Sequence, residues 1–490
     1  MRWWLQRVAC VLTMAAATAL IASADTIVLK SGRRIRATSV VEENGRVSYE
    51  TSAGRLSLPL SSVDHVERGN SVDMGSGGSS AAAAGATSEI SSSSPPPAVT
   101  SSDADAISKT VLAGGSIDRN YIEQLEIAAQ NGGGKDAGDR VALAHHVAAQ
   151  FELQHGDIKS ATAHYRRGLT YSPDNLGLLL NLSYLLLRQS EYSEAIECLE
   201  RAERVDPQSA VVPKFKGWAY SGQNKLDLAV AEWKKSLALR ADPEVERALA
   251  KAQRDLQEEA DYREGQSSHF QLRYSGAAAP QTLVRDILKT LEAHYAVIES
   301  TLNYTPPESI GVVLYTGQAF MDITRAPAWA GALNDGRIRV PVQGLREMNP
   351  ELSRTLKHEL THSFITQKTR ARCPTWIQEG VAQWMEGASA GDSASSFVAS
   401  FDHTHQTISL GALEGPWINL PGTDARIAYA WSLSVVEFII KQGGSEDITR
   451  MLDQIAAGSE AQVAAKNIVR MDYPELEEET MRYLRSTYVH

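Results

Sequence analysis

The chain has 490 residues, of which 43% are hydrophobic and 22% charged, a composition ordinary for a folded protein of about three domains. This composition excludes wholesale disorder, and 35 Gly with 18 Pro exclude a collagen-like repeat. The formal net charge of −11 argues against a nucleic-acid binder, because neutralising phosphates requires clustered Lys and Arg.

The N-terminal segment 1–24 is typical of a secretory signal peptide. Arg2 and Arg7 precede an apolar stretch at 8–22, and Ala-Ser-Ala at 22–24 is a small-residue cleavage site. The apolar stretch is shorter than the roughly 18 residues of a membrane span, although an uncleaved anchor remains the alternative. We therefore expect a periplasmic or secreted protein without a stable membrane span after cleavage.

Two further segments precede the helical part of the chain. Short polar–apolar alternations separated by Gly-containing turns predict a small antiparallel β-barrel at 25–68, interpreted as an accessory binding or assembly module. The composition of 69–105, rich in Gly, Ser, Ala and Pro, predicts a flexible linker.

Only Cys198 and Cys373 remain after signal cleavage, so no disulfide framework is expected.

A helical repeat is visible between about 138 and 262. Ala161, Ala195 and Ala229 stand 34 residues apart, and each is followed four positions later by a bulky residue. Those bulky residues are Tyr165, Leu199 and Trp233. The segment resembles a three-repeat tetratricopeptide (TPR) array, and we assign 106–265 to it. The small and aromatic residues are interpreted as core.

The TPR resemblance implies a concave groove for a peptide or protein partner, without identifying that partner. The charged stretch 244–264 is predicted to continue the array as a solvent-facing capping helix. From 266 to 490 the pattern is mixed and predicts an α+β domain. Within it, a turn at 334–336 leads into a strand at 337–342, where Pro341 predicts a sheet edge.

The chemistry is concentrated in the motif His-Glu-Leu-Thr-His at 358–362. Asn349 and Pro350 are suited to the first turn of the helix that carries it. A separate apolar stripe on this helix is formed by Leu352, Leu356, Leu360 and Phe364. His358 and His362 are about 40° apart around the axis, so both imidazoles can bind one zinc ion.

A catalytic zinc ion requires a third protein ligand. Glu379 lies 17 positions after His362, which leaves enough chain to finish the helix, cross a loop and begin a second helix. It can then complete a His-His-Glu site. The alternative for Glu379 is an ordinary solvated helix residue.

At this point the chain resembles a gluzincin, the zinc peptidase group that includes thermolysin and the monozinc aminopeptidases. The resemblance rests on the HExxH motif, on Trp-x-x-Glu-Gly-x-Ala at 376–382 and on Glu386. The order of domains resembles exported peptidase MA-like proteins fused to TPR repeats. The spacer of 16 residues is short for the group, and the Gly-x-Met-Glu-Asn exopeptidase signature is absent from the sequence, so endopeptidase chemistry is favoured.

The resemblance implies a role for each matching residue. His358, His362 and Glu379 would ligate Zn²⁺, and Glu359 would be the general base that activates water. Tyr429 would stabilise the oxyanion, or alternatively serve in packing. Gln383 and Glu386 are candidates to orient the ligands, with surface exposure as the alternative.

Two smaller predictions complete the peptidase interpretation. The edge strand at 337–342 would pair with extended substrate, as such strands do in gluzincins, or would be a plain protected edge. The pair His403 and His405 is interpreted as part of a polar loop rather than a second metal site.

The expected architecture is thus a small all-β barrel, an α-helical TPR solenoid and an α+β zincin-like metallopeptidase domain with an HExxH active-site helix. The favoured function is an exported zinc metallopeptidase acting on peptide or protein substrates, with the TPR array recruiting substrate or partner. A different class remains possible, namely an interaction scaffold whose zinc-binding domain is inactive or conditionally active.

Overall fold

The computed structural model divides into two compact units, Met1–Gly75 and Ser76–His490, which are described separately. The residues that it describes are 25–30, 34–37, 39–43, 46–51, 54–67, 104–132, 134–276, 278–324, 332–342, 344–404, 408–417 and 422–489. The predicted signal peptide and nearly all of the predicted linker lie outside these residues. Among the described helices, none has the length and apolar character needed to cross a bilayer.

The N-terminal unit contains two three-stranded antiparallel sheets, with strand orders β2-β1-β6 and β3-β4-β5. The strands are β1 (Asp25–Leu29), β2 (Arg34–Ala37), β3 (Ser39–Glu43), β4 (Arg46–Thr51), β5 (Gly54–Pro59) and β6 (Val63–Glu67). Ile27 and Val63 from the first sheet meet Val40 and Val47 from the second in a small core. Within the described part of 25–67 no strand pairing joins the sheets, so closure into a barrel stays a prediction.

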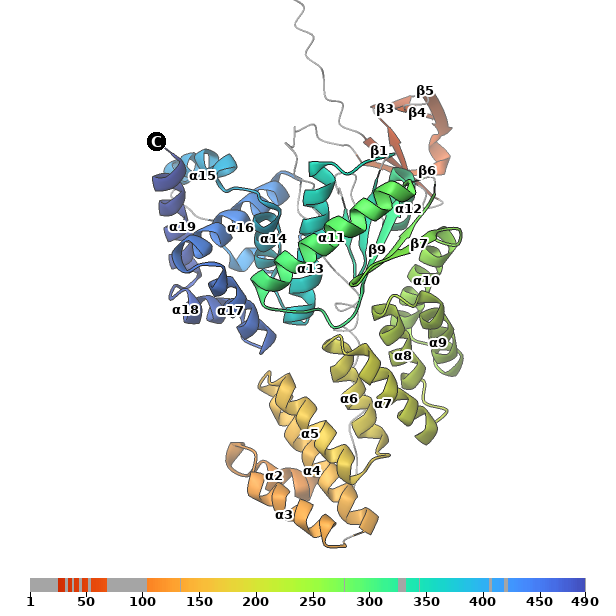
Figure 1. The fold of residues 1–490 in the computed structure, drawn as a ribbon, viewed down its shortest axis with the longest axis vertical. Helices are drawn as coiled ribbons and strands as arrows, with labels where there is room; N and C mark the ends of the chain where they lie inside the picture. Colours follow the sequence, from red (N-terminus) through yellow and green to blue (C-terminus); the bar gives the residue numbers. More distant parts are fainter. Residues whose placement is uncertain are drawn as a thin grey trace, which may run out of the picture. The chain divides into compact units, whose positions relative to one another are not determined.

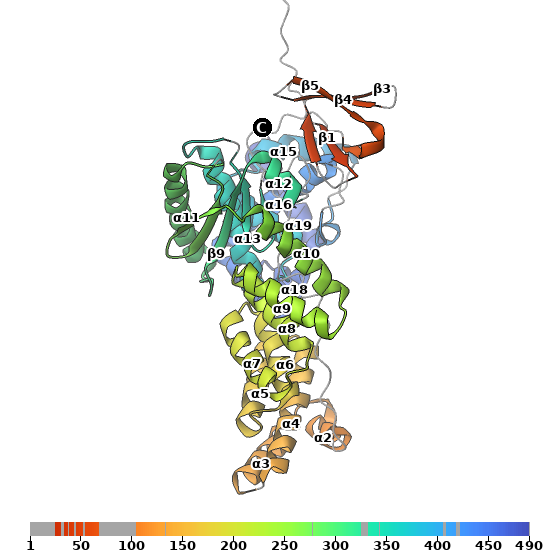
Figure 2. The same cartoon turned by 90° about the vertical axis from the view of Figure 1, so that its right-hand side faces the viewer.

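Helices α2 to α10 form a helical array that opens the second unit (Figure 1). They are α2 (Ala104–Val111), α3 (Arg119–Gln130), α4 (Gly134–Gln154), α5 (Ile158–Tyr171), α6 (Leu176–Arg188), α7 (Tyr192–Val205), α8 (Val211–Gly222), α9 (Leu226–Leu239) and α10 (Pro243–Glu258). Antiparallel pairs follow one another along the array (Figure 2). Helices α5, α7 and α9 begin at 158, 192 and 226, which repeats the 34-residue period.

The repeated small and bulky residues fill the spaces between these helices. Ala161, Ala195 and Ala229 are fully buried, and so are the bulky residues four positions after them. A Cβ atom at Gly217 would lie 2.3 Å from Nε1 of Trp233, so only glycine allows α8 and α9 to approach this closely. These residues therefore serve as core, as predicted from the period.

A five-stranded mixed sheet begins the remaining part of the unit, in the order β10-β11-β9-β8-β7. Its strands are β7 (Arg263–Gln266), β8 (Phe270–Tyr274), β9 (Ile310–Tyr315), β10 (Leu333–Asn334) and β11 (Ile338–Pro341). Strands β8, β9 and β11 run parallel, while β7 and β10 are antiparallel to their neighbours. The first strand of the sheet begins at Arg263, slightly before residue 266, where the sequence pattern predicted the start of the α+β domain.

The prediction that β11 forms the sheet edge was wrong. Among the described residues, the two-residue strand β10 lies outside it, pairing Leu333 with Arg339 and Asn334 with Ile338. Pro341 is the last residue of β11 and lies beyond both pairs, so its missing N–H costs no hydrogen bond to β10. The proposed pairing of extended substrate with β11 therefore loses its basis.

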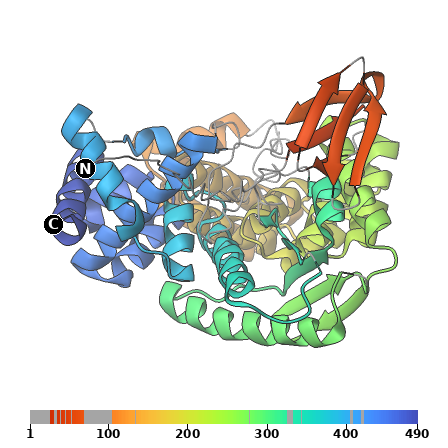
Figure 3. The ribbon, with the colours of Figure 1, turned by 90° about the horizontal axis from the view of Figure 1, so that it is seen from above.

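The two faces of the sheet are covered by different helices. Alternate side chains such as Val312 and Leu314 share a core with α11 (Gln281–Leu302) and α13 (Pro350–Thr369). These two helices lie side by side (Figure 1, Figure 3). The rings of Tyr295 in α11 and Phe364 in α13 are in edge contact. Val313 and Tyr315 point to the opposite face and pack with α12 (Gly317–Thr324).

The array's last helix, α10, also meets this second face. Asp255 and Glu259, at its C-terminal end, are buried against Arg337 and Arg339 of the β10–β11 hairpin. The prediction of a solvent-facing capping helix was therefore wrong for this part of α10. At this end of α10, Asp255 and Glu259 meet buried counter-charges rather than water.

Six helices complete the chain. They are α14 (Thr375–Glu386), α15 (Gly391–Thr404), α16 (Gly422–Gly443), α17 (Ser445–Ala456), α18 (Ala461–Ile468) and α19 (Tyr473–Tyr488). His403 is an exposed residue in the last turn of α15, where the sequence suggested a loop, whereas His405 lies outside the described residues. Cys198 and Cys373 are buried and unpaired, as expected.

Candidate metal centre

Helix α13 presents the HExxH motif because its sequence defines both its start and its buried face. The side chain of Asn349 accepts a hydrogen bond from the backbone N–H of Leu352 at 2.7 Å, and Pro350 occupies the first turn. The predicted stripe is buried in the core shared with α11 and the sheet. Its members are Leu352, Leu356, Leu360 and Phe364. This anchoring fixes the rotation of α13 and hence the direction in which His358 and His362 point.

Helix α14 supplies the third group of the site. The chain leaves α13 through Arg370 and Ala371, both with positive φ, and α14 begins after Pro374. A Cβ atom at Gly380 would lie 2.5 Å from the carbonyl oxygen of Ser432 in α16, so glycine permits a close approach of α14 and α16. Glu379 is the residue before this contact, and its side chain turns toward α13.

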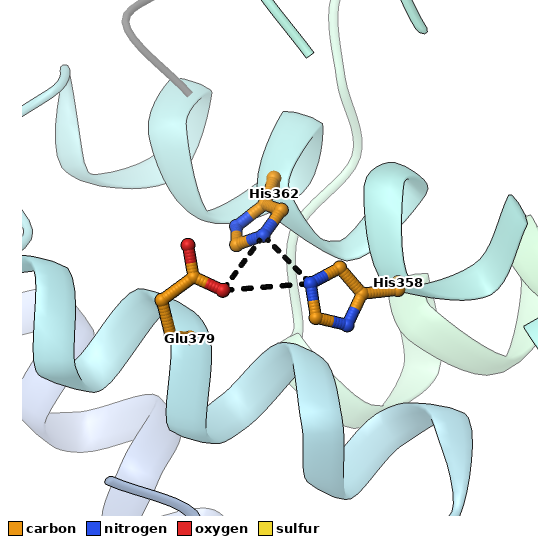
Figure 4. A group of neighbouring side chains, drawn as sticks. All are labelled: His358, His362 and Glu379. Atoms are coloured by element: carbon orange, nitrogen blue, oxygen red, sulfur yellow. Dashed lines mark hydrogen bonds and ion pairs between the residues drawn. The ribbon is translucent and has the colours of Figure 1, made fainter. Parts of the chain in front are cut away.

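His358, His362 and Glu379 converge on one point (Figure 4). The Nε2 atoms of the two histidines lie 3.1 Å apart, and each is 3.4 Å from Oε2 of Glu379. Three ligands in tetrahedral geometry at zinc distances lie about 3.3 Å from one another. The donor set and its spacing therefore fit a zinc ion.

Glu386, in the last turn of α14, contacts the other ring nitrogen of His358. Its Oε2 atom lies 3.2 Å from Nδ1, and the carboxylate is almost fully buried. The nearby carboxylate favours a proton on Nδ1, and the lone pair of the ring is then at Nε2, which faces Glu379 and His362. The charge of Glu386 thus favours the tautomer of His358 that leaves Nε2 available to a metal ion.

The electrostatics of this cluster favour a bound cation. Burial lowers the pKa of His358, but its bonds with Glu379 and Glu386 outweigh burial and raise the pKa well above its usual value. Burial raises the pKa of Glu379, yet His362 and His358 outweigh this effect and hold it below its ordinary value. The carboxylates thus stabilise positive charge, which either a proton or a metal ion can supply.

Glu359 is fully buried beside the ligands. Neither of its carboxylate oxygens has a hydrogen-bond partner among the described residues. Burial raises the pKa of Glu359 to about 7, against the opposing effect of His358 and His362. A buried carboxylate without a partner is costly unless another group, such as water, contacts it. This position is suited to a residue that exchanges a proton near neutral pH.

Two other residues named from the sequence also lie close to the ligands. Tyr429 of α16 is buried, and burial together with the nearby Glu379 and Glu359 carboxylates raises its pKa well above the usual value. Nε2 of Gln383 donates to the backbone carbonyls of Glu379, at 3.0 Å, and Tyr429, at 2.9 Å. Gln383 therefore joins the ligand-bearing turn of α14 to the turn of α16 that carries Tyr429.

Residues 303–486 match the family model of the peptidase MA superfamily. The chain contains a peptidase MA domain. The match includes both helices that carry the His-His-Glu cluster. Residues 152–216 match the model of the tetratricopeptide repeat, so the chain also contains TPR repeats. The peptidase MA domain and TPR repeats were both predicted from the motif and the 34-residue period, and both are confirmed.

Solved structures with local similarity include an M1 zinc metallopeptidase from Deinococcus radiodurans, 17% identical with a TM-score of 0.28, over 46% of this chain and 51% of that one. Another is the first TPR domain of Spaghetti (RPAP3) bound to an HSP90 peptide, 20% identical with a TM-score of 0.23. The match covers 24% of this chain and 93% of that one. A third is a thermophilic TPR protein of Thermus thermophilus, 24% identical with a TM-score of 0.22. The match covers 30% of this chain and 82% of that one. No curated protein matches the sequence significantly.

The contact between Glu386 and His358 leads to a first prediction for the peptidase MA domain. Glu386→Ala is expected to weaken zinc affinity about 10–100-fold, because His358 loses the carboxylate that favours a proton on Nδ1. Glu386→Gln keeps an acceptor oxygen and should lose less. Competition titration with a chromophoric chelator measures both affinities. Wild-type affinity in Glu386→Ala would show that the carboxylate does not orient the ligand.

Proposed function

We propose that this chain is an exported zinc-dependent metallopeptidase that cleaves internal peptide bonds of protein substrates. The observation that carries the proposal is the convergence of His358, His362 and Glu379 at zinc-ligand spacing, with buried Glu359 beside them, in a peptidase MA domain. The signal-like segment 1–24 supports export to the periplasm or the medium.

The proposed roles follow from the position and chemistry of each side chain. His358, His362 and Glu379 would hold the zinc ion, and Glu386 would orient His358. When bound, zinc supplies Lewis-acid chemistry, which polarises a carbonyl group and makes hydroxide available near neutral pH.

Glu359 would accept the proton of the attacking water and then deliver it to the departing amine. Its burial supports this role, because a base with a pKa near the working pH can both take and return a proton. Tyr429 would donate its hydroxyl proton in a hydrogen bond to the oxyanion that develops on the substrate. A tyrosine whose pKa is raised stays protonated, as this role requires.

The TPR repeats would recruit the protein substrate or a partner that delivers it. Endopeptidase chemistry is favoured because the sequence lacks the exopeptidase signature that would hold a free substrate amine. The remaining class is a scaffold that binds zinc and cleaves nothing, and the following experiment separates the two.

Purified residues 25–490 are expected to contain one zinc ion per chain and to cleave an unfolded protein such as reduced casein. A chelator should abolish cleavage, and added zinc should restore it. Metal analysis and gel-based cleavage assays measure both properties. A protein without stoichiometric zinc would refute the proposed function, and a zinc-loaded protein without cleavage would favour the scaffold.

A further inference from the structure

A hydrogen bond joins the β10–β11 hairpin to the turn of α13 that carries Glu359. Nδ2 of Asn334 donates to the backbone carbonyl of Glu359 at 2.8 Å and to Oγ of Ser363 at 2.7 Å. Asn334 is almost fully buried, and its Oδ1 accepts from the N–H of Gly336 at 3.2 Å, which orients the amide. The amide therefore holds the backbone of the Glu359 turn without contacting the metal ligands.

The hairpin is in turn held by the last helix of the TPR array. Asp255 of α10 lies 3.0 Å from Arg337 and 2.6 Å from Arg339, and Glu259 lies 2.6 Å from Arg337. All four residues are at most 5% exposed. Arg337, just before β11, and Arg339, within it, thus meet two carboxylates one helical turn apart. Each arginine forms a bidentate pair with one carboxylate, which fixes the orientation of the hairpin relative to α10.

Asp335 and Tyr315 extend this network, and Asp335 brings it to the turn next to Asn334. Asp335 accepts from Nε of Arg339 at 2.8 Å and pairs with Lys251 of α10 at 3.0 Å. The hydroxyl of Tyr315 in β9 donates to Glu259 at 3.0 Å and accepts from Arg339 at 2.6 Å. The turn at 334–337 is thereby tied to α10 on one side and to α13 on the other.

We propose that Asn334 is a positioning residue for Glu359, and that α10 keeps Asn334 in place through its ion pairs with the hairpin. A buried ionic network gains little stability over apolar packing, but it defines a single relative orientation of the elements that it joins. The TPR array therefore has a second role beyond recruitment, because its terminal helix is part of the support of the peptidase site. This inference rests on the proposed function only for the effect on turnover.

The test compares Asn334→Ala and Asn334→Asp in the full mature chain. Aspartate has the shape of asparagine but no N–H donor at neutral pH, so it should lose at least as much function as alanine. Both variants should keep stoichiometric zinc, lower kcat about 10–100-fold and change KM by less than about twofold. Hydrogen exchange of the α13 amides at 356–367 should become faster in both.

Asp255→Asn and Glu259→Gln test the role of α10. Each should speed exchange at 356–367 and lower kcat, although the substituted groups lie in a helix of the TPR array. Thr449→Val is the matched control, because Thr449 makes a part-buried side-chain hydrogen bond between two other elements, to the carbonyl of Thr301 at 3.0 Å, from α17 to the end of α11. The control should lower stability but leave kcat and α13 exchange unchanged.

Wild-type kcat and wild-type α13 exchange in both Asn334 variants would overturn the positioning role. Wild-type behaviour of Asp255→Asn and Glu259→Gln would overturn the contribution of α10. The exchange measurement does not depend on activity. If the wild-type protein cleaves no substrate, the proposed function is refuted. Hydrogen exchange of α13 in the Asn334, Asp255 and Glu259 variants still tests the positioning role.

Discussion

Replacing Glu359 by Gln is expected to lower kcat for peptide hydrolysis about 10²–10⁴-fold, the range typical of losing a general base. Glutamine has nearly the same size as glutamate but cannot accept the proton of the attacking water. Because Glu359 lies beside the proposed ligands without being one of them, the variant should still bind one zinc ion per chain. Steady-state kinetics and metal analysis on the same preparation measure both quantities.

Two comparison variants sharpen this result. Glu351→Gln makes the same chemical change at an exposed position two turns earlier on α13, and it should leave kcat unchanged. Tyr429→Phe should lower kcat about 10²–10³-fold, as expected for removing one oxyanion donor, and should retain zinc. Unchanged cleavage by Glu359→Gln would refute its role as the base, and unchanged kcat in Tyr429→Phe would assign the tyrosine to packing.

Adding zinc to the metal-free protein is expected to raise the free energy of unfolding by about 4 kcal/mol at a free concentration 1,000 times Kd. Glu379→Gln should remove most of this stabilisation, because a neutral amide replaces the charged ligand that faces both histidines. Thermal unfolding of both proteins, at matched free zinc concentrations, measures the difference.

Glu347→Gln is the control for this comparison, because Glu347 is exposed and precedes α13. Its zinc-dependent stabilisation should equal that of the wild-type chain. If Glu379→Gln were stabilised by zinc as strongly as the wild type, Glu379 would not be a ligand. The third ligand would then have to come from another residue.

The local parts of the site could be predicted because their signals are local in the sequence. The cap at Asn349, the apolar stripe of α13 and the spacing of His358 and His362 depend on helical geometry alone. Predicting that Glu379 approaches the two histidines required more information, because α13 and α14 must pack in one particular way. The family resemblance supplied that information, and the structure brings the three side chains together.

The supports of the site could not be predicted in the same way. Periodicity shows that one face of α10 is polar, but it does not show whether that face meets water or a buried counter-charge. Asp255 and Arg339 are 84 positions apart, and their pairing depends on how the array and the sheet meet. Asn334 lies in a sequence that is typical of an ordinary turn. Its hydrogen bond to the carbonyl of Glu359 depends on tertiary structure, which the sequence pattern does not show.

The position of α10 has a consequence for how such proteins can be assembled from modules during evolution. Val245, Ala248 and Ala252 of α10 belong to the core of the array, whereas Asp255 and Glu259 neutralise two guanidinium groups of the sheet. A recombination event at the composition change near 265 would remove both of these carboxylates, which would leave Arg337 without an acidic partner and Arg339 with only Asp335 among the described residues. We therefore expect homologous peptidase domains with this hairpin to be inherited together with their terminal array helix, even where the preceding repeats differ in number.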